Sequence, residues 1–351
     1  MLMLVACAPE PSAPSASSAE EPSAPPDEEV VASDVEAAVE EDVLPFDQIR
    51  LIVPFAPGGG QERAARQIQP YLAAHLQKTV AVEPIPGGNT AVGSAVAARD
   101  GADCSTVLQT PIPHLQFAWL LQDVDFTSDD FAPLGHLYRE GSAIVVRNDA
   151  PWDNLQEMID DARERPGEIS FSTSAMTSPF YLALLEIERA AGVDFNIVNY
   201  DGGGPARTAL LGGEVDGTHV GVFAVQPIVD EARVLAVHQD ENLWTDITQD
   251  APTVEEALGM EVAEAVIVHV GMFVSAACQQ DYPERYEALV AAVEAAGTES
   301  AYQDDLVEIG EDDKFDYLPP EEFATIIDEQ LTRLRQEIEN TPELAELAAG
   351  E

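Results

Sequence analysis

The chain has 351 residues, 46% of them hydrophobic, which is enough for the core of two domains or of one large two-lobed domain. Its charge is extreme, because 65 acidic residues against 16 basic ones give a formal net charge of −49. This surplus excludes nucleic-acid binding, which needs clustered lysine and arginine, and no apolar run reaches the roughly 18 residues that span a bilayer.

The acidic residues are spread over the whole chain. Residues 8–42 hold 11 of them and no basic residue, which leaves 54 acidic against 16 basic residues elsewhere. Self-repulsion on this scale destabilises a compact state in dilute buffer, whereas at about 1 M salt the Debye length falls to roughly 3 Å and screens it. The composition therefore predicts a halophilic protein. An acidic surface kept for solubility alone is the alternative.

The N-terminal segment resembles a lipoprotein signal. Leu4-Val5-Ala6-Cys7 matches the lipobox, in which the cysteine is lipidated after cleavage. Few residues precede Cys7, so either the true start lies upstream or the match is chance. Pro, Ser, Ala and Glu then follow without periodicity, which is typical of a solvated tether. We expect a truncated signal over 1–7, with lipidation at Cys7, and an acidic tether over 8–45.

Strands and helices alternate from about residue 46. An apolar run predicts a strand over 48–55 that ends at a glycine turn, 57–60, and helical spacing predicts the helix that follows, from Ala64 to Leu76. A second strand, 79–83, precedes a second glycine turn. Further strands are predicted near 105–109, 143–147, 169–173, 195–199, 234–238 and 267–274, and helices near 155–164, 179–191, 205–212, 284–296 and 321–339. The alternation predicts parallel sheets covered on both faces, with ligands at the carboxyl ends of strands.

The glycine turn after the first strand is a candidate anion site. Backbone N–H groups in such a loop, at the N-terminus of a helix, bind phosphate or carboxylate without a basic side chain. The turn lacks the Gly-Lys-Ser/Thr of a P-loop and the G-x-G-x-x-G of dinucleotide-binding folds. Three glycines before a helix also occur because a tight turn needs them, and these residues alone leave both interpretations open.

The sequence IRLIVPFAPGGGQERAAR, residues 49–66, resembles the opening motif of the substrate-binding proteins of tripartite tricarboxylate transporters, the Bug family. The likeness covers about residues 47–335 in co-linear order. It continues through residues 82–93, 103–108, 131–134, 145–147, 172–183, 199–216 and 251–256.

This resemblance implies an α/β fold of the type II periplasmic-binding-protein class, with two lobes joined by two crossing strands near 142–147 and 264–271. The implied divisions are lobe 1 over 46–142 and 270–340, lobe 2 over 143–269, and an acidic tail over 341–351. The implied function is that of a monomeric, lipid-anchored, extracytoplasmic receptor. It captures a small di- or tricarboxylate between its lobes and delivers it to the membrane permease subunits. A receptor that presents its ligand to a membrane sensor is the alternative.

The resemblance also implies a site in which backbone amides and ordered water hold the carboxylate, with no cofactor or metal. The implied ligand-binding residues are Phe55, Pro57, Gly58, Gly59, Gly60, Gln61, Glu62, Gly87, Thr173, Ser174, Ser178, Tyr181, Tyr200, Gly202 and Gly221. The chain departs from the family pattern at several of these loops: Glu62 replaces an aspartate, Ala175 and Thr177 replace glycines, Tyr181 a histidine and Asp201 a lysine. Tyr181 either donates a hydrogen bond or only packs.

Three cysteines are too few for a disulfide scaffold, and they show no C-x-x-C spacing. If Cys7 is lipidated, two remain. The resemblance places Cys104 at the start of a lobe 1 strand and Cys278 after the strand that returns to that lobe, so we expect a disulfide between them. Two unpaired, buried cysteines are the alternative. The six histidines follow no metal-binding pattern and no G-x-S-x-G motif occurs, so the sequence does not indicate an enzyme.

Overall fold

The computed structural model describes residues 43–176, 178–262, 267–311 and 314–349, which belong to one compact unit, Asp42–Glu351. Cys7, nearly all of the predicted tether and Thr177 lie outside the described residues. None of the described helices is long and apolar enough to cross a membrane.

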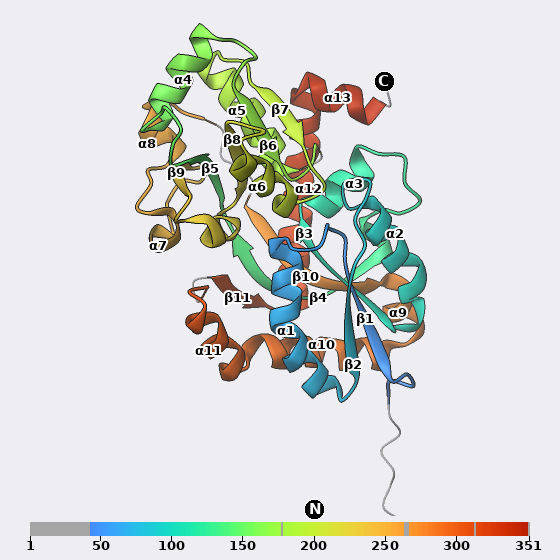
Figure 1. Cartoon of the computed structure of the whole chain (residues 1–351). Helices are drawn as coiled ribbons and strands as arrows, with labels where there is room; N and C mark the ends of the chain where they lie inside the picture. The colour runs from blue at the N-terminus through green and yellow to red at the C-terminus, as the bar shows by residue number, and fades with distance from the viewer. Residues whose placement is uncertain (1–42, 177, 263–266, 312–313, 350–351) are drawn as a thin grey trace, which may run out of the picture. The chain divides into compact units, whose positions relative to one another are not determined.

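The first sheet carries the glycine turn predicted after the first strand. Its described strands lie in the order β11 (Phe315–Leu318), β4 (Phe131–Glu140), β10 (Val268–Ser275), β3 (Thr106–Ile112), β1 (Gln48–Val53) and β2 (Thr79–Pro84). Successive side chains of β1 enter opposite core clusters. Leu51 packs with helices α1 (Gly60–Leu76) and α10 (Pro283–Thr298), and Ile52 with the helices of the other face. Both faces of this sheet are therefore covered, and we call the part built on it lobe 1 (Figure 1).

The second sheet has the same layered construction, and we call the part built on it lobe 2. Its described strands lie in the order β7 (Asn196–Asn199), β6 (Ser170–Thr173), β8 (Gly217–Gly221), β5 (Ser142–Arg147) and β9 (Ala232–Val237). Ile144 and Ala143, neighbours on β5, belong to separate core clusters. Helices α4 (Leu155–Glu164), α5 (Pro179–Ala191) and α8 (Val254–Leu258) contribute to the first cluster, and α6 (Gly203–Gly212) and α7 (Thr245–Thr248) to the second.

The chain passes between the two sheets at Gly141, which separates β4 of lobe 1 from β5 of lobe 2. It returns to lobe 1 with β10, and part of the second predicted crossing lies outside the described residues. The two-lobed α/β fold is thus confirmed. The prediction of parallel sheets is correct only in part. β1 runs parallel to β2 and β3, and β6 parallel to β7 and β8, whereas β10 runs antiparallel to both β3 and β4, and β5 antiparallel to both β8 and β9. A strand that arrives from the other lobe enters its sheet against the direction of the neighbours it joins.

Two helices have the predicted bounds because their ends carry strong local signals. Asn154 caps α4, and its side-chain oxygen accepts a hydrogen bond from the Glu157 amide. Ser178 caps α5 in the same way, Pro179 occupies the first helical position, and Gly192 ends the helix in the left-handed conformation.

Several elements are absent from the predicted set. They include α2 (Ala91–Asp100), α3 (His114–Leu120), β4, β8, α7, α8, α9 (Ala276–Asp281), α11 (Ser300–Glu308), β11 and α13 (Pro342–Ala349). Small residues dominate α2 and glycines lie at both ends of β8, so their periodicity is weak. Pro133 and Gly135 interrupt β4, which nevertheless lies between two neighbours in the sheet.

The predicted acidic tail is not a tail in the part that the structure describes. Pro342–Ala349 forms helix α13, which follows α12 (Pro320–Asn340). Leu344 of α13 is 1% exposed and packs in one cluster with Leu334 of α12 and Leu182 of α5. An apolar side chain therefore fixes an otherwise acidic segment to the body of the protein.

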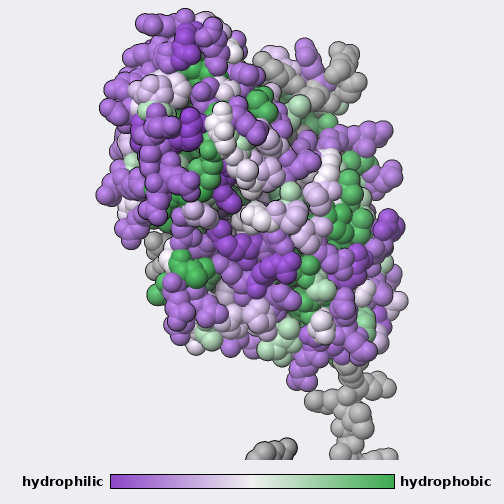
Figure 2. Space-filling view, viewed as in Figure 1, coloured by the Kyte–Doolittle hydropathy of each residue, from purple (hydrophilic) through white to green (hydrophobic). Residues whose placement is uncertain are grey.

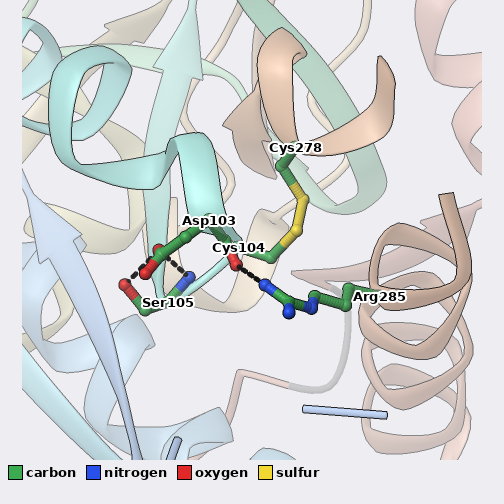
Figure 3. Close-up of a disulfide and its surroundings, with 5 residues drawn as sticks. All are labelled: Asp103, Cys104, Ser105, Cys278 and Arg285. Carbon is green, nitrogen blue, oxygen red and sulfur yellow. Dashed lines mark hydrogen bonds between the residues drawn. A yellow bond between two sulfur atoms is a disulfide. The ribbon is translucent and has the colours of Figure 1, made fainter. Parts of the chain in front are cut away.

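A disulfide joins Cys104 to Cys278 across a sequence separation of 174 residues, with their Cα atoms 5.1 Å apart (Figure 3). Cys104 does not open a strand as predicted. It follows the short helix η1 (Gly101–Asp103), with a φ of +74°, and Cys278 lies in α9. Arg285 donates to the backbone oxygen of Asp103 beside the bridge. The bridge ties the loop before β3 to the helix that follows β10.

Candidate ligand-binding site

A cavity lies where residues of both lobes meet. Its volume is about 50 Å³. Lobe 1 contributes residues from the loop after β1, from the end of β3 and from β4, and lobe 2 contributes residues from the loops around α5, α6 and β8. The lining residues are Phe55, Ala56, Gly59, Gly60, Gln61, Pro111, His114, Glu140, Ser174, Phe180, Gly202, Gly203, Gly221 and Ala224.

Two helix N-termini, one from each lobe, open at this cavity. Gly59 is the N-cap of α1 and Gly202 the N-cap of α6, and neither end has a side-chain capping hydrogen bond. Gly202 has a φ of +115°, a conformation that only glycine adopts without strain. The first N–H groups of a helix have no intrahelical partner, and each end carries about half a positive charge. The arrangement suits an anion.

One amide of the predicted anion loop is already occupied. The Glu62 carboxylate accepts a hydrogen bond from Gly58 N at 2.7 Å and also binds Arg66. The Gly58 hydrogen bond, together with Arg66, holds the pKa of the Glu62 carboxyl below its usual value. Glu62 therefore fixes the turn from within the chain.

The cavity contains buried polar atoms that lack a partner among the described residues. His114 is 2% exposed and Ser174 is 4% exposed, yet neither His114 Nδ1 nor Ser174 Oγ makes a hydrogen bond to any described residue. Burial lowers the pKa of His114 to about 3, so its ring is neutral. Its ring contacts Phe55 on one side and Phe180 on the other, edge to face at 5.7 Å in both cases. Buried polar atoms normally have partners, so these two atoms are available to hydrogen-bond a ligand in the cavity.

A carboxylate also lines the cavity. Glu140 is the last residue of β4, directly before the crossing at Gly141, and its side chain is buried. Burial raises the pKa of Glu140 to about 7, against the opposing effect of Lys314. Lys314 itself is 3% exposed and binds Glu311 at 3.0 Å, and Arg63 binds the same carboxylate at 2.7 Å.

The two lobes are in contact around the cavity. Ala56 N of lobe 1 donates to Asp201 O of lobe 2 at 3.4 Å. Arg63 donates to Phe223 O at 3.2 Å, and Gln226 of lobe 2 donates to Gly310 O of lobe 1 at the same distance. The described residues therefore show the lobes closed on each other.

The structure brings together about half of the predicted site residues. Those that line the cavity are Phe55, Gly59, Gly60, Gln61, Ser174, Gly202 and Gly221. Pro57, Gly58 and Tyr200 line a separate surface hollow with Arg207, and Gly87 lines a smaller hollow that includes Ser174 and Gly202.

The remaining predicted residues have local contacts. Thr173 donates to Asn199 Oδ1, and Ser178 caps α5. Tyr181, on the first turn of α5, is half-buried and is not among the residues that line the cavity.

The prediction missed His114, Glu140 and Phe180, although two of them had a usable signal. His114 follows the carboxyl end of β3, which is where ligands lie in such sheets, but the predicted strand ended too early, at 109. Glu140 lies two residues before the start of the predicted crossing at 142–147, and a crossing of this kind passes the cleft between the lobes. In the described residues, no group of three or more His, Cys, Asp or Glu is placed to hold a metal ion.

Comparison with known proteins gives the family. The profile described as "Tripartite tricarboxylate transporter family receptor", TctC, matches residues 64–342. The chain belongs to this family. A relative encoded in the tcbD-tcbE intergenic region of Pseudomonas sp. (strain P51) is 27% identical over 248 residues, which are 70% of this chain and 74% of the relative.

Two solved protein structures share the fold. MatC from Rhodopseudomonas palustris, with bound malate, is 22% identical, with a TM-score of 0.72 over 84% of this chain and 99% of MatC. A second R. palustris protein, solved with adipate, is 23% identical, with a TM-score of 0.72 over 87% of this chain and 98% of that protein. The family and the two-lobed fold of TctC solute-binding proteins are therefore established for this chain, as the sequence predicted.

Proposed function

We propose that this TctC protein is an extracytoplasmic receptor that captures a small carboxylate between its lobes and delivers it to the permease of a tripartite tricarboxylate transporter. The observation that carries the proposal is the pair of uncapped helix N-termini, one from each lobe, at one closed cavity. The malate and adipate bound to the two structural relatives support a carboxylate as ligand.

The two lobes hold the ligand jointly. Lobe 1 offers the amides at the start of α1, together with Gln61 and His114, and lobe 2 offers the start of α6 and Ser174. A carboxylate in the open protein would contact only one set of these groups. Because the closed state adds the second set, ligand binding shifts the equilibrium towards closure.

The size of the cavity favours a compact acid. A space of about 10–15 Å³ holds one water molecule, and the closed cavity measures about 50 Å³. We therefore expect an acid with few carbon atoms to bind more tightly than a tricarboxylate, for which the lobes would have to stay further apart.

The test is a thermal-shift screen of mono-, di- and tricarboxylates in high salt, followed by calorimetry on the best ligand. A ligand that binds the native state raises the melting temperature according to RT ln(1 + [L]/Kd). Ser174→Ala removes an unpartnered hydroxyl from the cavity and is expected to weaken binding about fivefold to tenfold. Ser94→Ala is the matched control, because Ser94 Oγ is also buried without a partner among the described residues but lies on α2, outside the cavity lining.

A screen in which no carboxylate stabilises the protein, or equal loss of affinity in both serine variants, contradicts carboxylate capture at this cavity. Delivery to a permease is tested by deleting the gene and measuring uptake of the identified ligand. Uptake that persists at the wild-type rate contradicts that part of the proposal.

We further propose that the protein is a monomer that carries a lipid anchor on Cys7. It lies on the outer face of the cytoplasmic membrane or in the periplasm. Cys7→Ala is expected to abolish incorporation of labelled lipid and to release the protein from the membrane fraction. Equal membrane association of the variant and the wild type contradicts the anchor, and size-exclusion chromatography with light scattering tests the monomer.

A further inference from the structure

The cavity has a charge pattern that a simple carboxylate does not match. Among the described residues that line it there is no lysine or arginine, and its one charged side chain is Glu140. The helix N-termini at Gly60 and Gly203 supply partial positive charge to the same space. One site thus combines groups that attract an anion with a buried carboxylate that repels it.

Glu140 has no ion-pair partner among the described residues. The nearby cations are used elsewhere, because Lys314 and Arg63 both make their side-chain ion pairs with Glu311. A backbone hydrogen bond from Phe223 helps to stabilise the charged form of Glu140. The cluster of Glu140, Glu311, Lys314 and Arg63 therefore leaves one carboxylate turned to the cavity, where it can accept a hydrogen bond from a ligand.

The Glu140 side chain occupies a space that the opposite lobe leaves open. A Cβ atom built on Gly221 of β8 would clash with the Glu140 carboxyl group, so the absence of a side chain at 221 makes room for it. The carboxylate of lobe 1 thus lies against the backbone of lobe 2. A ligand group bound to Glu140 is enclosed by both lobes, and water is largely excluded from the contact.

We propose that Glu140 selects a ligand that carries an ammonium group as well as a carboxylate, that is, a small amino acid. This inference rests on the proposed capture of a carboxylate and names the class of acid. The carboxylate binds at the helix N-termini, and the ammonium group donates to Glu140 and forms the direct ion pair that Glu140 lacks among the described residues. A hydroxyl in the same place donates a hydrogen bond but forms no ion pair, and an acid with neither group forms neither interaction.

The test compares ligands with one carbon skeleton that differ at one position. Succinate, L-malate and L-aspartate form one series, and propionate, L-lactate and L-alanine a second, smaller one. We would titrate all six into the full chain by calorimetry at pH 8 in high salt. The amine-bearing member of at least one series is expected to bind about tenfold or more tightly than both analogues.

Glu140→Gln keeps the shape of the side chain and removes its charge. The preference for the amine is expected to fall to about twofold or less, with equal or tighter binding of the acid that lacks the amine. Glu337→Gln is the matched control, because Glu337 of α12 also has a pKa raised by burial but is not among the residues that line the cavity. The control is expected to retain the wild-type preference.

The wild-type protein provides a second readout that needs no variant. Glu140 loses its proton as the pH rises through about 7, so the amine preference is expected to increase between pH 6 and pH 8.5. The ammonium group of a free amino acid stays largely charged over this range, because its own carboxylate stabilises the charge. The charged and titratable groups that face Glu140 are Tyr138, Arg63, Glu311 and Lys314. Lys314 and Arg63 lower the pKa of Glu140, and Glu311 raises it, so these three groups set the pH at which the preference changes. Burial raises the pKa of Tyr138 well above its usual value, so Tyr138 stays neutral throughout.

Equal or tighter binding of the acids without an amine in the wild type at pH 8 would overturn the inference. So would an amine preference that survives Glu140→Gln, or a preference that does not change with pH. If none of the six acids bound although another carboxylate stabilised the protein in the thermal-shift screen, the inference about Glu140 would be overturned and carboxylate capture would stand. If no carboxylate stabilised the protein, the proposed capture itself would be contradicted, which separates the two failures.

Discussion

Gly59 and Gly204 lie against each other across the cleft: a Cβ atom built on Gly204 would lie 3.3 Å from both Cα and N of Gly59. Gly59 is the N-cap of α1 in lobe 1, and Gly204 lies in the first turn of α6 in lobe 2. Two glycines thus allow the two helix N-termini to approach closely where the lobes meet.

Gly204→Ala is expected to weaken ligand binding about threefold to tenfold without a large change in unfolding stability. The added methyl group must displace the Gly59 backbone by a few tenths of an ångström before the lobes can close. Gly212→Ala is the control on the same helix, where the nearest atoms to a new Cβ belong to the Glu214 side chain at 3.9 Å. Calorimetry that gives the same affinity for both variants contradicts the proposed closure contact.

Gly59→Val tests the same contact from lobe 1. The Cβ itself finds ordinary spacing, 3.5 Å from Ala56 O and 3.8 Å from Gly204 N. Valine adds two further methyl groups with a restricted choice of rotamers to this narrow contact between the lobes. We expect a larger loss of affinity than for Gly204→Ala. A folded Gly59→Val protein with unchanged affinity would remove the anion loop from the proposed site.

The sequence predicted some elements with their observed bounds and missed others. The helices α4 and α5 were predicted with their observed bounds because Asn154, Ser178 and Gly192 are local signals that act wherever they occur. Strand β4 was missed because its Pro133 and Gly135 contradict local propensity. Only pairing with β10 and β11 makes this segment a strand.

The candidate site shows the same division. The glycine turn after β1 was found because a strand, a glycine turn and a helix are contiguous in the chain. The role of Glu140 depends on Gly221, on Lys314 and on the end of β4, which are far apart in sequence and meet only after folding. Local patterns therefore identified the glycine turn that we propose to bind the anion, and tertiary contacts determine where Glu140 lies.

The hydrogen bond from Gln226 to Gly310 O joins the two lobes on the surface, and it offers a second test of closure. Gln226→Ala is expected to weaken ligand binding about fivefold, since a typical hydrogen bond contributes about 1 kcal/mol. Gln249→Ala is the control, because Gln249 donates to Val229 O within lobe 2. Stopped-flow measurement should place most of the effect of Gln226→Ala on the dissociation rate, and equal rates for the two variants would contradict a role in closure.

The bridge between Cys104 and Cys278 is expected to stabilise the fold by about 3–5 kcal/mol in the chain-entropy model, because it closes a long loop. The check is intact mass after alkylation of the denatured protein without reductant, followed by unfolding in urea with and without prior reduction. Alkylation of both Cys104 and Cys278 would show that the bridge is absent from the secreted protein. A reduced protein as stable as the oxidised one would contradict its structural role.

Buried histidines should make the protein less stable in mild acid. Burial lowers the pKa of His114, His219 and His269 to about 3, whereas histidine in an unfolded chain titrates near 6.5. Below about pH 6.5 the unfolded state binds protons that the folded state does not, so the free energy of unfolding falls as the pH decreases. Glu140 acts in the opposite direction below about pH 7, because its folded-state pKa is raised, and so does Glu337, whose pKa burial also raises. Burial lowers the pKa of a fourth histidine, His136, so we expect the histidines to determine the direction of the change.

Urea unfolding at several pH values between 7.5 and 5 measures this slope. His219→Gln removes one buried ring that binds Phe180 O and Ser142 Oγ, and is expected to reduce the slope by up to about 1.4 kcal/mol per pH unit. His75→Gln, at an exposed histidine paired with Glu299, is the control. A His219→Gln slope equal to that of the wild type would contradict this account.

Salt should stabilise the protein strongly, because its surplus of acidic residues lies largely on the surface. Of the two lysines, Lys314 is buried and contributes no surface charge, and hydrophilic residues dominate the face shown in Figure 2. Between 0.1 M and about 1 M salt the Debye length falls from roughly 10 Å to roughly 3 Å, which screens repulsion between neighbouring carboxylates. We expect the melting temperature to rise by at least about 5 °C between 0.1 M and 2 M KCl.

Sucrose at matched osmolality is the control, because it separates charge screening from general exclusion of solutes. A melting temperature that stays flat in KCl, or that rises equally in sucrose, would make the acidity a matter of solubility alone.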